Sequence, residues 1–110
     1  MGEGVVEITD AQAWEREVLR SPGLVMVVFW AKWCAPCMKL LATIDGLSQE
    51  PGWGVKIVRL NVDGHPRITS ENRISIVPTT AFFRNGKKLR EMINAVPAEQ
   101  LAEAVAKLQG

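Results

Sequence analysis

LVMVVFWAKWCAPC, residues 24–37, is the most informative segment of this chain. Its first seven residues are all apolar, which is typical of a strand buried on both faces at the centre of a parallel sheet. A helix is expected from Pro36, because a proline in the first helical turn loses no hydrogen bond. Cys34 and Cys37 stand at the junction in C-x-x-C spacing. The segment therefore predicts a strand, a pair of thiols and a helix in direct succession.

Strand and helix patterns alternate on both sides of this segment. Asn85-Gly86 between two apolar runs predicts a tight hairpin, and Thr9 with Gln12 has the spacing of a capping box that opens a helix. We expect strands at 5–8, 24–30, 55–62, 79–83 and 89–93, helices at 9–19, 36–48 and 97–108, and a marginal helix between 63 and 73. Helical crossovers make the first three strands parallel, and the hairpin adds an antiparallel pair. The expected fold class is α/β: a central, mixed, five-stranded sheet with helices on both faces.

Two of the expected helices carry an apolar stripe. Apolar residues recur in them every three or four positions, which places these residues on one helical face. The stripes are Met38, Leu41, Ile44 and Leu47 in the first helix, and Leu101, Ala104, Val105 and Leu108 in the second. We expect these faces to be buried.

Length and composition indicate a single domain over residues 1–110. The chain is 47% hydrophobic and carries 13 Lys and Arg against 12 Asp and Glu, a net charge of +1. Because this charge creates no long-range positive field, we expect neither nucleic acid nor a membrane surface as the main partner. The apolar run 24–31 is too short to cross a bilayer, and residues 1–7 lack the pattern of a signal peptide. We expect a cytoplasmic monomer.

Redox chemistry explains the two cysteines best. Cys34 directly precedes the helix, where free N–H groups and the positive end of the helix dipole stabilise an anion, so its pKa should lie below the ~8.5 of a free thiol. Cys37, one turn further in, should be less exposed and suited to resolving a mixed disulfide. A zinc site would need two more ligands, but His65 is the only histidine and there is no third cysteine. We expect no metal; two buried, inert cysteines are the remaining alternative.

Residues 29–37, FWAKWCAPC, resemble the active-site segment of thioredoxins, whose commonest form is Trp-Cys-Gly-Pro-Cys. The resemblance implies the thioredoxin fold and a dithiol–disulfide oxidoreductase that reduces disulfides in other proteins. It also implies a redox-active Cys34–Cys37 disulfide with no bound cofactor, and an electron donor of the thioredoxin reductase type. The likeness continues in order along the chain, at 5–10, 60–63, 77–79, 83–87 and 100–101.

The same resemblance implies how the site is arranged. Pro78 is expected to form a cis peptide bond beside the cysteines, and the backbone of Val77 to pair with an extended substrate segment. The residues expected to support the active site are Trp33, Ala35, Pro36 and Pro78. Those expected to bind substrate are Trp33, Val77, Pro78, Asn94 and Ala95.

Several positions depart from the thioredoxin pattern. Val28 stands where thioredoxins usually carry a buried Asp that assists proton transfer at the resolving cysteine, so Cys37 should lose its proton more slowly. Arg59 stands where the family has a Lys near that Asp; its charge either supports a thiolate or reaches water at the end of a stem that follows the sheet. The other departures are Ala35 for Gly, Met38 for Lys, Ala42 for Pro and Asn94 for Gly.

These departures leave two other functions open. A thioredoxin-fold module could hold a partner or client protein with only weak redox activity, which the loss of an acid at Val28 permits. An oxidase or isomerase of an oxidising compartment would need a signal peptide that has been removed and a less reducing cysteine pair. Turnover of a protein disulfide and the reduction potential of the Cys34–Cys37 pair separate the three functions.

Overall fold

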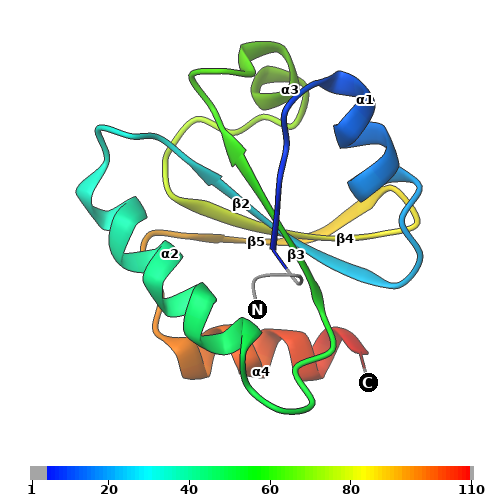
Figure 1. The fold of residues 1–110 in the computed structure, drawn as a ribbon, viewed down its shortest axis with the longest axis vertical. Coiled ribbons are helices and arrows are strands. Elements are labelled where there is room, and N and C mark those ends of the chain that lie inside the picture. Colours follow the sequence, from blue (N-terminus) through cyan, green and yellow to red (C-terminus); the bar gives the residue numbers. More distant parts are fainter. Residues whose placement is uncertain (1–4, 110) are drawn as a thin grey trace.

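The computed structural model describes residues 5–109 of the chain (Figure 1). No helix within this range is long and apolar enough to cross a membrane. The signal-peptide expectation rests on residues 1–7 and falls partly outside the described residues. The elements are β1 (Val5–Glu7), α1 (Ala11–Trp14), the π-helical turn η2 (Glu15–Leu19), β2 (Leu24–Trp30), α2 (Ala35–Ser48), β3 (Lys56–Asn61), α3 (Pro66–Glu71), β4 (Thr79–Arg84), β5 (Lys87–Ile93) and α4 (Ala98–Gln109).

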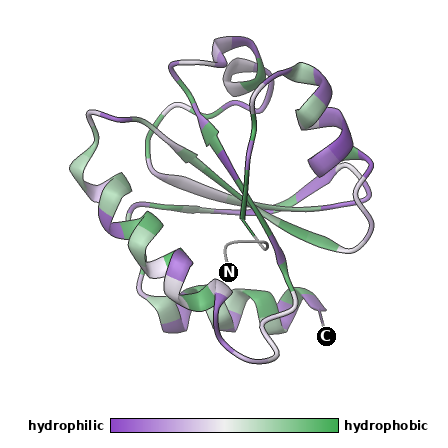
Figure 2. Cartoon of the chain, viewed as in Figure 1, coloured by the Kyte–Doolittle hydropathy of each residue, from purple (hydrophilic) through white to green (hydrophobic). Residues whose placement is uncertain are grey.

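The five strands form one sheet in the order β1-β3-β2-β4-β5. β3 runs parallel to both β1 and β2, while β4 is antiparallel to β2 and to β5, so the expected mixed sheet is confirmed. β2 is central, and its burial pattern leaves only Trp30 partly exposed. Figure 2 shows this hydrophobic centre of the sheet. Because the parallel strands β2 and β3 end at the same edge, the segments that follow them meet there.

Helices cover both faces of the sheet, with α1 and α3 on one side and α2 and α4 on the other (Figure 1). Under α1 and α3, the ring of Trp14 lies 6.1 Å from that of Phe29 and 5.6 Å from that of Phe83, measured between centroids. The other face buries a second apolar layer that includes Met26, Val28, Leu40, Phe82 and Leu101. Close packing of both layers stabilises the sheet from two sides.

The first helix starts differently from the prediction. Asp10 is its N-cap, with an extended backbone and a carboxylate that accepts a hydrogen bond from the N–H of Ala13 at 2.7 Å. The predicted capping box of Thr9 and Gln12 is therefore wrong, because the capping residue must directly precede the first helical residue. The helix also does not stay α-helical to its end but continues as the wider η2, which the apolar pattern does not indicate.

α2 begins at Ala35, and its buried face differs from the predicted stripe. Met38 is exposed although it was expected to be buried. Successive helical residues are turned by about 100°, so Met38 points away from the face on which Cys37 lies. The buried positions are Cys37, Leu40, Leu41 and Ile44.

The hairpin between β4 and β5 is confirmed. Asn85 and Gly86 have φ values of 54° and 77°, as a tight turn requires, and both residue types adopt positive φ readily. Gly86 also lies against η2, because a Cβ at this position would come within 3.1 Å of the carbonyl oxygen of Leu19. The turn therefore joins the strands and packs on the first helical layer.

Candidate active site

A disulfide joins Cys34 and Cys37 at the N-terminus of α2, with the two Cα atoms 5.2 Å apart. Cys34 is the N-cap of the helix, and its Sγ accepts a hydrogen bond from the N–H of Cys37 at 3.2 Å. Pro36 lies in the first turn, where its missing N–H leaves no bond unmade. The helix thus places a backbone donor and the positive end of its dipole at the Cys34 sulfur, which stabilises a thiolate there after reduction.

The two cysteines differ in their access to solvent. Cys34 is 5% exposed, whereas Cys37 is completely buried. Both belong to a small apolar cluster with Ala31, and the residues packed against this cluster are Trp30, Val62 and Val77. Cys34 is therefore the outer sulfur of the pair, and Cys37 lies behind it.

Trp33, next to the disulfide, is 71% exposed. Its indole Nε1 donates a hydrogen bond to Oδ2 of Asp63, 2.8 Å away. The N–H of Asp63 in turn donates to Oδ1 of Asn61 at 3.0 Å. Asp63 was not among the residues predicted for the site, although its place directly after a parallel strand could have indicated it. This hydrogen bond orients an exposed aromatic ring beside Cys34.

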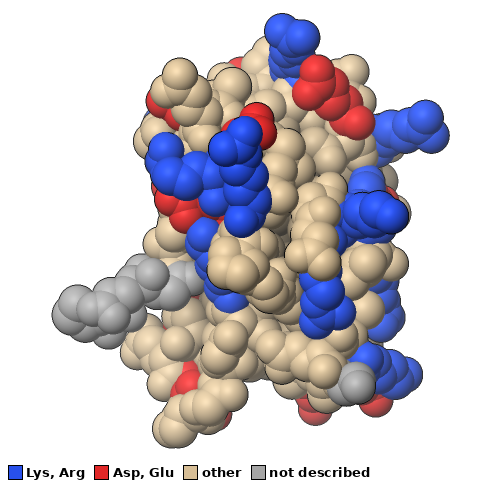
Figure 3. All heavy atoms as spheres, turned by 90° about the vertical axis from the view of Figure 1, so that its right-hand side faces the viewer, with Lys and Arg blue, Asp and Glu red and all other residues tan. Residues whose placement is uncertain are grey.

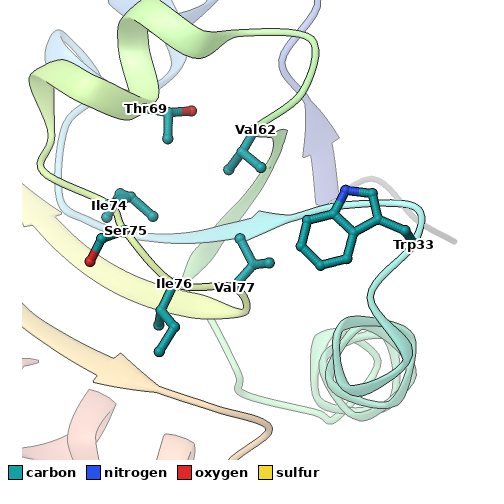
Figure 4. A pocket seen from close by; sticks show the side chains of 7 residues that line it. All are labelled: Trp33, Val62, Thr69, Ile74, Ser75, Ile76 and Val77. Atoms are coloured by element: carbon teal, nitrogen blue, oxygen red, sulfur yellow. The ribbon is translucent and has the colours of Figure 1, made fainter.

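An open, mainly apolar groove of about 330 Å³ lies next to the cysteine cluster (Figure 4). In Figure 4 the ring of Trp33 lies on one side of it, with Val62 and Val77 opposite. Val62 and Val77 also pack against the cysteine cluster, which places the groove beside the disulfide. Its lining residues are Trp33, Val62, Thr69, Ile74, Ser75, Ile76 and Val77.

The predicted substrate-binding residues are distributed around this groove. Trp33 and Val77 line it, and Pro78 is buried directly after Val77, to which a cis peptide bond joins it. The N–H of Asn94 donates to the carbonyl oxygen of Pro78 at 3.0 Å. The loop of Asn94 and Ala95 therefore lies next to Pro78 and not on the groove wall. The lining residues missing from the prediction are Val62, Thr69, Ile74, Ser75 and Ile76.

Val28 is fully buried at the position where thioredoxins usually have an acid. On the neighbouring strand, Nε of Arg59 lies 3.0 Å from Oε1 of Glu7, and the guanidinium carbon lies 4.8 Å from the centre of the Trp30 ring. A carboxylate and an indole face therefore hold this guanidinium at the sheet, while the Arg59 side chain remains 26% exposed. Burial raises the pKa of Glu7 above 4.5, and Arg59, Trp30 and His65 each lower it in part.

His65, the residue before α3, is half-buried. Its Nε2 lies 3.1 Å from the carbonyl oxygen of Ile8, so the ring links the start of α3 to the end of β1. Because these segments lie at the same edge of the sheet, the turn packs against it. Between residues 5 and 109, no group of three or more His, Cys, Asp or Glu side chains is arranged to hold a metal ion.

Similar proteins were found by sequence. The family model Thioredoxin matches residues 5–107. A chloroplastic M-type thioredoxin of Spinacia oleracea is 37% identical over 107 residues, which is 96% of this chain and 59% of that protein. A thioredoxin of Porphyra purpurea is 34% identical over 103 residues, which is 94% of this chain and 95% of that protein. The chain thus spans 59% of the length of the spinach relative and nearly all of the algal one.

A comparison with solved structures also finds a thioredoxin. The crystal structure of Malassezia sympodialis thioredoxin (Mala s 13) matches with a TM-score of 0.86 and 29% sequence identity. The match covers 96% of this chain and 91% of that one. It therefore includes the sheet, its helices and the segment that carries the two cysteines.

Proposed function

This chain belongs to the thioredoxin family, and from that premise we propose that it is a protein dithiol–disulfide oxidoreductase that reduces disulfides in other proteins. The observation that carries the proposal is the hydrogen bond from the N–H of Cys37 to the sulfur of Cys34 at the start of α2. A thiolate in this position is stabilised by the backbone donor and the helix dipole, and it is a good nucleophile for thiol–disulfide exchange.

Two exchange steps account for the reaction. The Cys34 thiolate attacks one sulfur of a substrate disulfide; a mixed disulfide forms, and the other substrate sulfur leaves as a thiolate that takes up a proton. Cys37 then loses its proton and attacks the Cys34 sulfur, which releases the second substrate thiol. The substrate has gained two electrons and two protons, and the chain ends as the Cys34–Cys37 disulfide. An external dithiol or reductase returns the two electrons.

The groove suits an extended polypeptide as substrate. Apolar side chains of the bound segment can pack on Trp33, Ile76 and Val77, while main-chain hydrogen bonds give affinity with little demand on sequence. Trp33 and Ile76 are both exposed and available for such contacts. The net charge of +1 gives the molecule as a whole no strong field to select substrates. Figure 3 shows one face of the molecule, on which Lys and Arg side chains predominate over Asp and Glu.

Turnover of insulin disulfides with dithiothreitol as the electron source tests the proposed activity. We expect Cys34→Ser to abolish turnover, and Cys37→Ser to accumulate the mixed disulfide with substrate because the resolving thiol is missing. Equal turnover by Cys34→Ser and the parent would overturn the proposal.

A partner-binding function is favoured by one observation, the fully buried Val28 in place of an acid. If the parent has negligible turnover and Cys34→Ser still retains a co-purifying partner, this second function replaces the first. The choice of assay matters here, since a slow resolving step lowers turnover but leaves the mixed disulfide detectable.

We further propose that the reaction runs towards reduction of the substrate disulfide and takes place in the cytoplasm. A reductase-type donor and a cytoplasmic location require a reducing cysteine pair, with a reduction potential of about −270 mV. Equilibration with glutathione measures this potential, and a value of about −120 mV would instead indicate an oxidase. Alkylation of thiols in intact cells tests the location, because in the cytoplasm the pair should be trapped mainly as the dithiol.

A further inference from the structure

Four residues, one from each of four neighbouring strands, form a row across the sheet. In the strand register, Glu7 of β1 is the partner of Arg59 of β3, and Val28 of β2 is the partner of Arg59 on its other side. Thr80 of β4 is in turn the partner of Val28. Because side chains alternate along a strand, all four belong to the face that α2 and α4 cover. Arg59 therefore has an acid on the side of β1 and an aliphatic side chain on the side of β2.

Glu7 and Arg59 hold the indole of Trp30 from two directions. Oε2 of Glu7 accepts a hydrogen bond from Nε1 of Trp30 at 3.3 Å, while Oε1 lies 3.0 Å from Nε of Arg59. The guanidinium carbon of Arg59 lies 4.8 Å from the centre of the Trp30 ring, a cation–π distance. One carboxylate thus fixes the edge of the ring and the cation that lies over its face.

Trp30 connects this charged pair to the redox site. Its ring packs against the cluster of Ala31, Cys34 and Cys37, and also against the apolar layer under α2. The exposed fractions of the Arg59 and Glu7 side chains are 26% and 41%, so solvent screens the two charges only in part. Trp30 therefore lies between this partly screened ion pair and the cysteine cluster.

We propose that Glu7 is a positioning residue, which together with Arg59 holds Trp30 against the disulfide and balances the charge behind it. The inference rests on the proposed redox function of the cysteine pair. Two groups that carry or can carry positive charge face Glu7: Arg59 from β3 and His65 from the segment before α3. The acid of the pair thus lies on β1, on the far side of β3 from the position that Val28 occupies on β2.

Charge balance predicts opposite effects for the two members of the pair. Glu7→Gln leaves the positive charge of Arg59 uncompensated, which favours the Cys34 thiolate and hence the reduced form. Arg59→Gln leaves the negative charge of Glu7 uncompensated, which disfavours the thiolate. The double variant carries neither charge and should return close to the parent. A purely structural loss would instead move both single variants in the same direction.

Two measurements on the purified protein test this. The first is the rate of Cys34 alkylation by iodoacetamide at pH 7, and the second is the redox equilibrium with glutathione. We expect Glu7→Gln to raise, and Arg59→Gln to lower, both the alkylation rate and the dithiol-to-disulfide ratio by about threefold. Glu15→Gln is the matched control, because it breaks the exposed ion pair with Arg20 on η2 and should change neither quantity.

Shifts of equal sign in the two single variants, or shifts no larger than in the control, would overturn the proposal. If Arg59→Gln does not fold, Arg59→Lys takes its place: it keeps the charge, and we expect both quantities to stay close to the parent, so a threefold loss would also contradict charge balance. Neither measurement uses a protein substrate. Failure of insulin turnover would therefore count against the proposed function, whereas unchanged alkylation and redox equilibrium would count against the role of Glu7.

Discussion

The two faces of the sheet differ in the polar side chains that they carry. One face lies under α1 and α3, and the other lies under α2 and α4. The buried cluster on the first face is entirely apolar and centres on the rings of Trp14, Phe29 and Phe83. The second face contains the row of Glu7, Arg59, Val28 and Thr80. Within residues 5–109, the buried side-chain N and O atoms without a hydrogen-bond partner are Nε1 of Trp53, Nε of Arg59 and Oγ1 of Thr80. Of these, Nε of Arg59 is in an ion pair with Glu7, and Trp53 packs on the second face too.

Because of this difference, we expect one face to contribute mainly to stability and the other to influence the chemistry of the cysteines. An apolar layer with complementary packing gives the largest stabilisation, because each buried ring loses its contact with water and gains dispersion contacts. Unpartnered polar atoms reduce stability but can respond to a charge nearby. The face that carries the cysteine helix is therefore the less optimised for stability and the more responsive to charge, and the substitutions below test this contrast.

Trp14→Ala should have the largest effect on folding. It removes a buried indole that packs on two phenylalanines, and we expect the free energy of unfolding to fall by about 4 kcal/mol. Urea unfolding measures this loss, while insulin turnover per folded molecule should stay unchanged. Trp33→Ala is the matched control with the reverse pattern: because Trp33 is exposed beside the disulfide, KM should rise with little loss of stability. A large fall in turnover by folded Trp14→Ala would contradict the claim that the face under α1 and α3 contributes to stability alone.

Val28→Asp should have the next largest effect, and it acts on chemistry as well. The new carboxylate would lie between Arg59, which is in an ion pair with Glu7, and Thr80, whose buried Oγ1 has no hydrogen-bond partner among residues 5–109. We expect about tenfold faster disulfide exchange at pH 7, because a base behind Cys37 assists its deprotonation, and a loss of about 2 kcal/mol of stability from burying a charge. Val28→Asn controls for the change in polarity alone and should lose stability without gaining rate. An unchanged rate in Val28→Asp would contradict the proton-transfer argument.

Gly86→Ala tests the contact between the hairpin and the first helical layer. Alanine would have to adopt a φ of 77° and place its Cβ 3.1 Å from the carbonyl oxygen of Leu19. We expect a loss of about 1–2 kcal/mol in urea unfolding, with turnover unchanged. Asn85→Ala, at the neighbouring position with positive φ but without that contact, should cost less. Equal losses in the two variants would remove the packing part of the explanation.

The pH dependence of stability should differ in sign between Glu7 and Glu17. Burial raises the pKa of Glu7 above 4.5, so ionising it weakens the fold as pH rises through the raised value. The hydrogen bond from Lys56 lowers the pKa of Glu17, so its contribution is complete above pH 4.5 and is lost as pH falls through the lowered value.

Thermal unfolding of Glu7→Gln and Glu17→Gln between pH 4 and pH 7 measures these slopes. Relative to the parent, Glu7→Gln should gain stability as the pH rises, by less than about 1 kcal/mol because Glu7 is partly exposed to screening water. Glu17→Gln should lose stability relative to the parent over the same range. Slopes of the same sign for both variants would contradict the assigned causes.

Part of the site could be predicted because its signals are local. The run from Leu24 to Trp30, the turn at Asn85-Gly86 and the cysteines before Pro36 each depend on neighbouring residues, and the structure places all three as expected. The Asp10 cap was missed because it depends on the exact residue at which the helix begins. The exposure of Met38 was missed because the predicted stripe left out Cys37 and Leu40, which centre the buried face away from Met38.

Contacts between distant residues could not be predicted in the same way. Trp33 and Asp63 are 30 residues apart, and Trp30 and Glu7 are 23 apart. A single exposed acid has no local pattern that names its partner. The strand order β1-β3-β2 brings Glu7 to Arg59, and the end of β3 brings Asp63 to Trp33.

The amino-acid sequence by itself determined the strands, the hairpin, the redox pair and the order of the two sulfurs, because hydrophobic periodicity, turn chemistry and a helix N-terminus act over a few residues. Only the tertiary structure decided which side chains form the groove and which acid faces Arg59, because strand register sets those contacts between segments far apart in the chain. Chemistry at Cys34 is thus a local property of this sequence, while the shape and charge around it are properties of the assembled sheet.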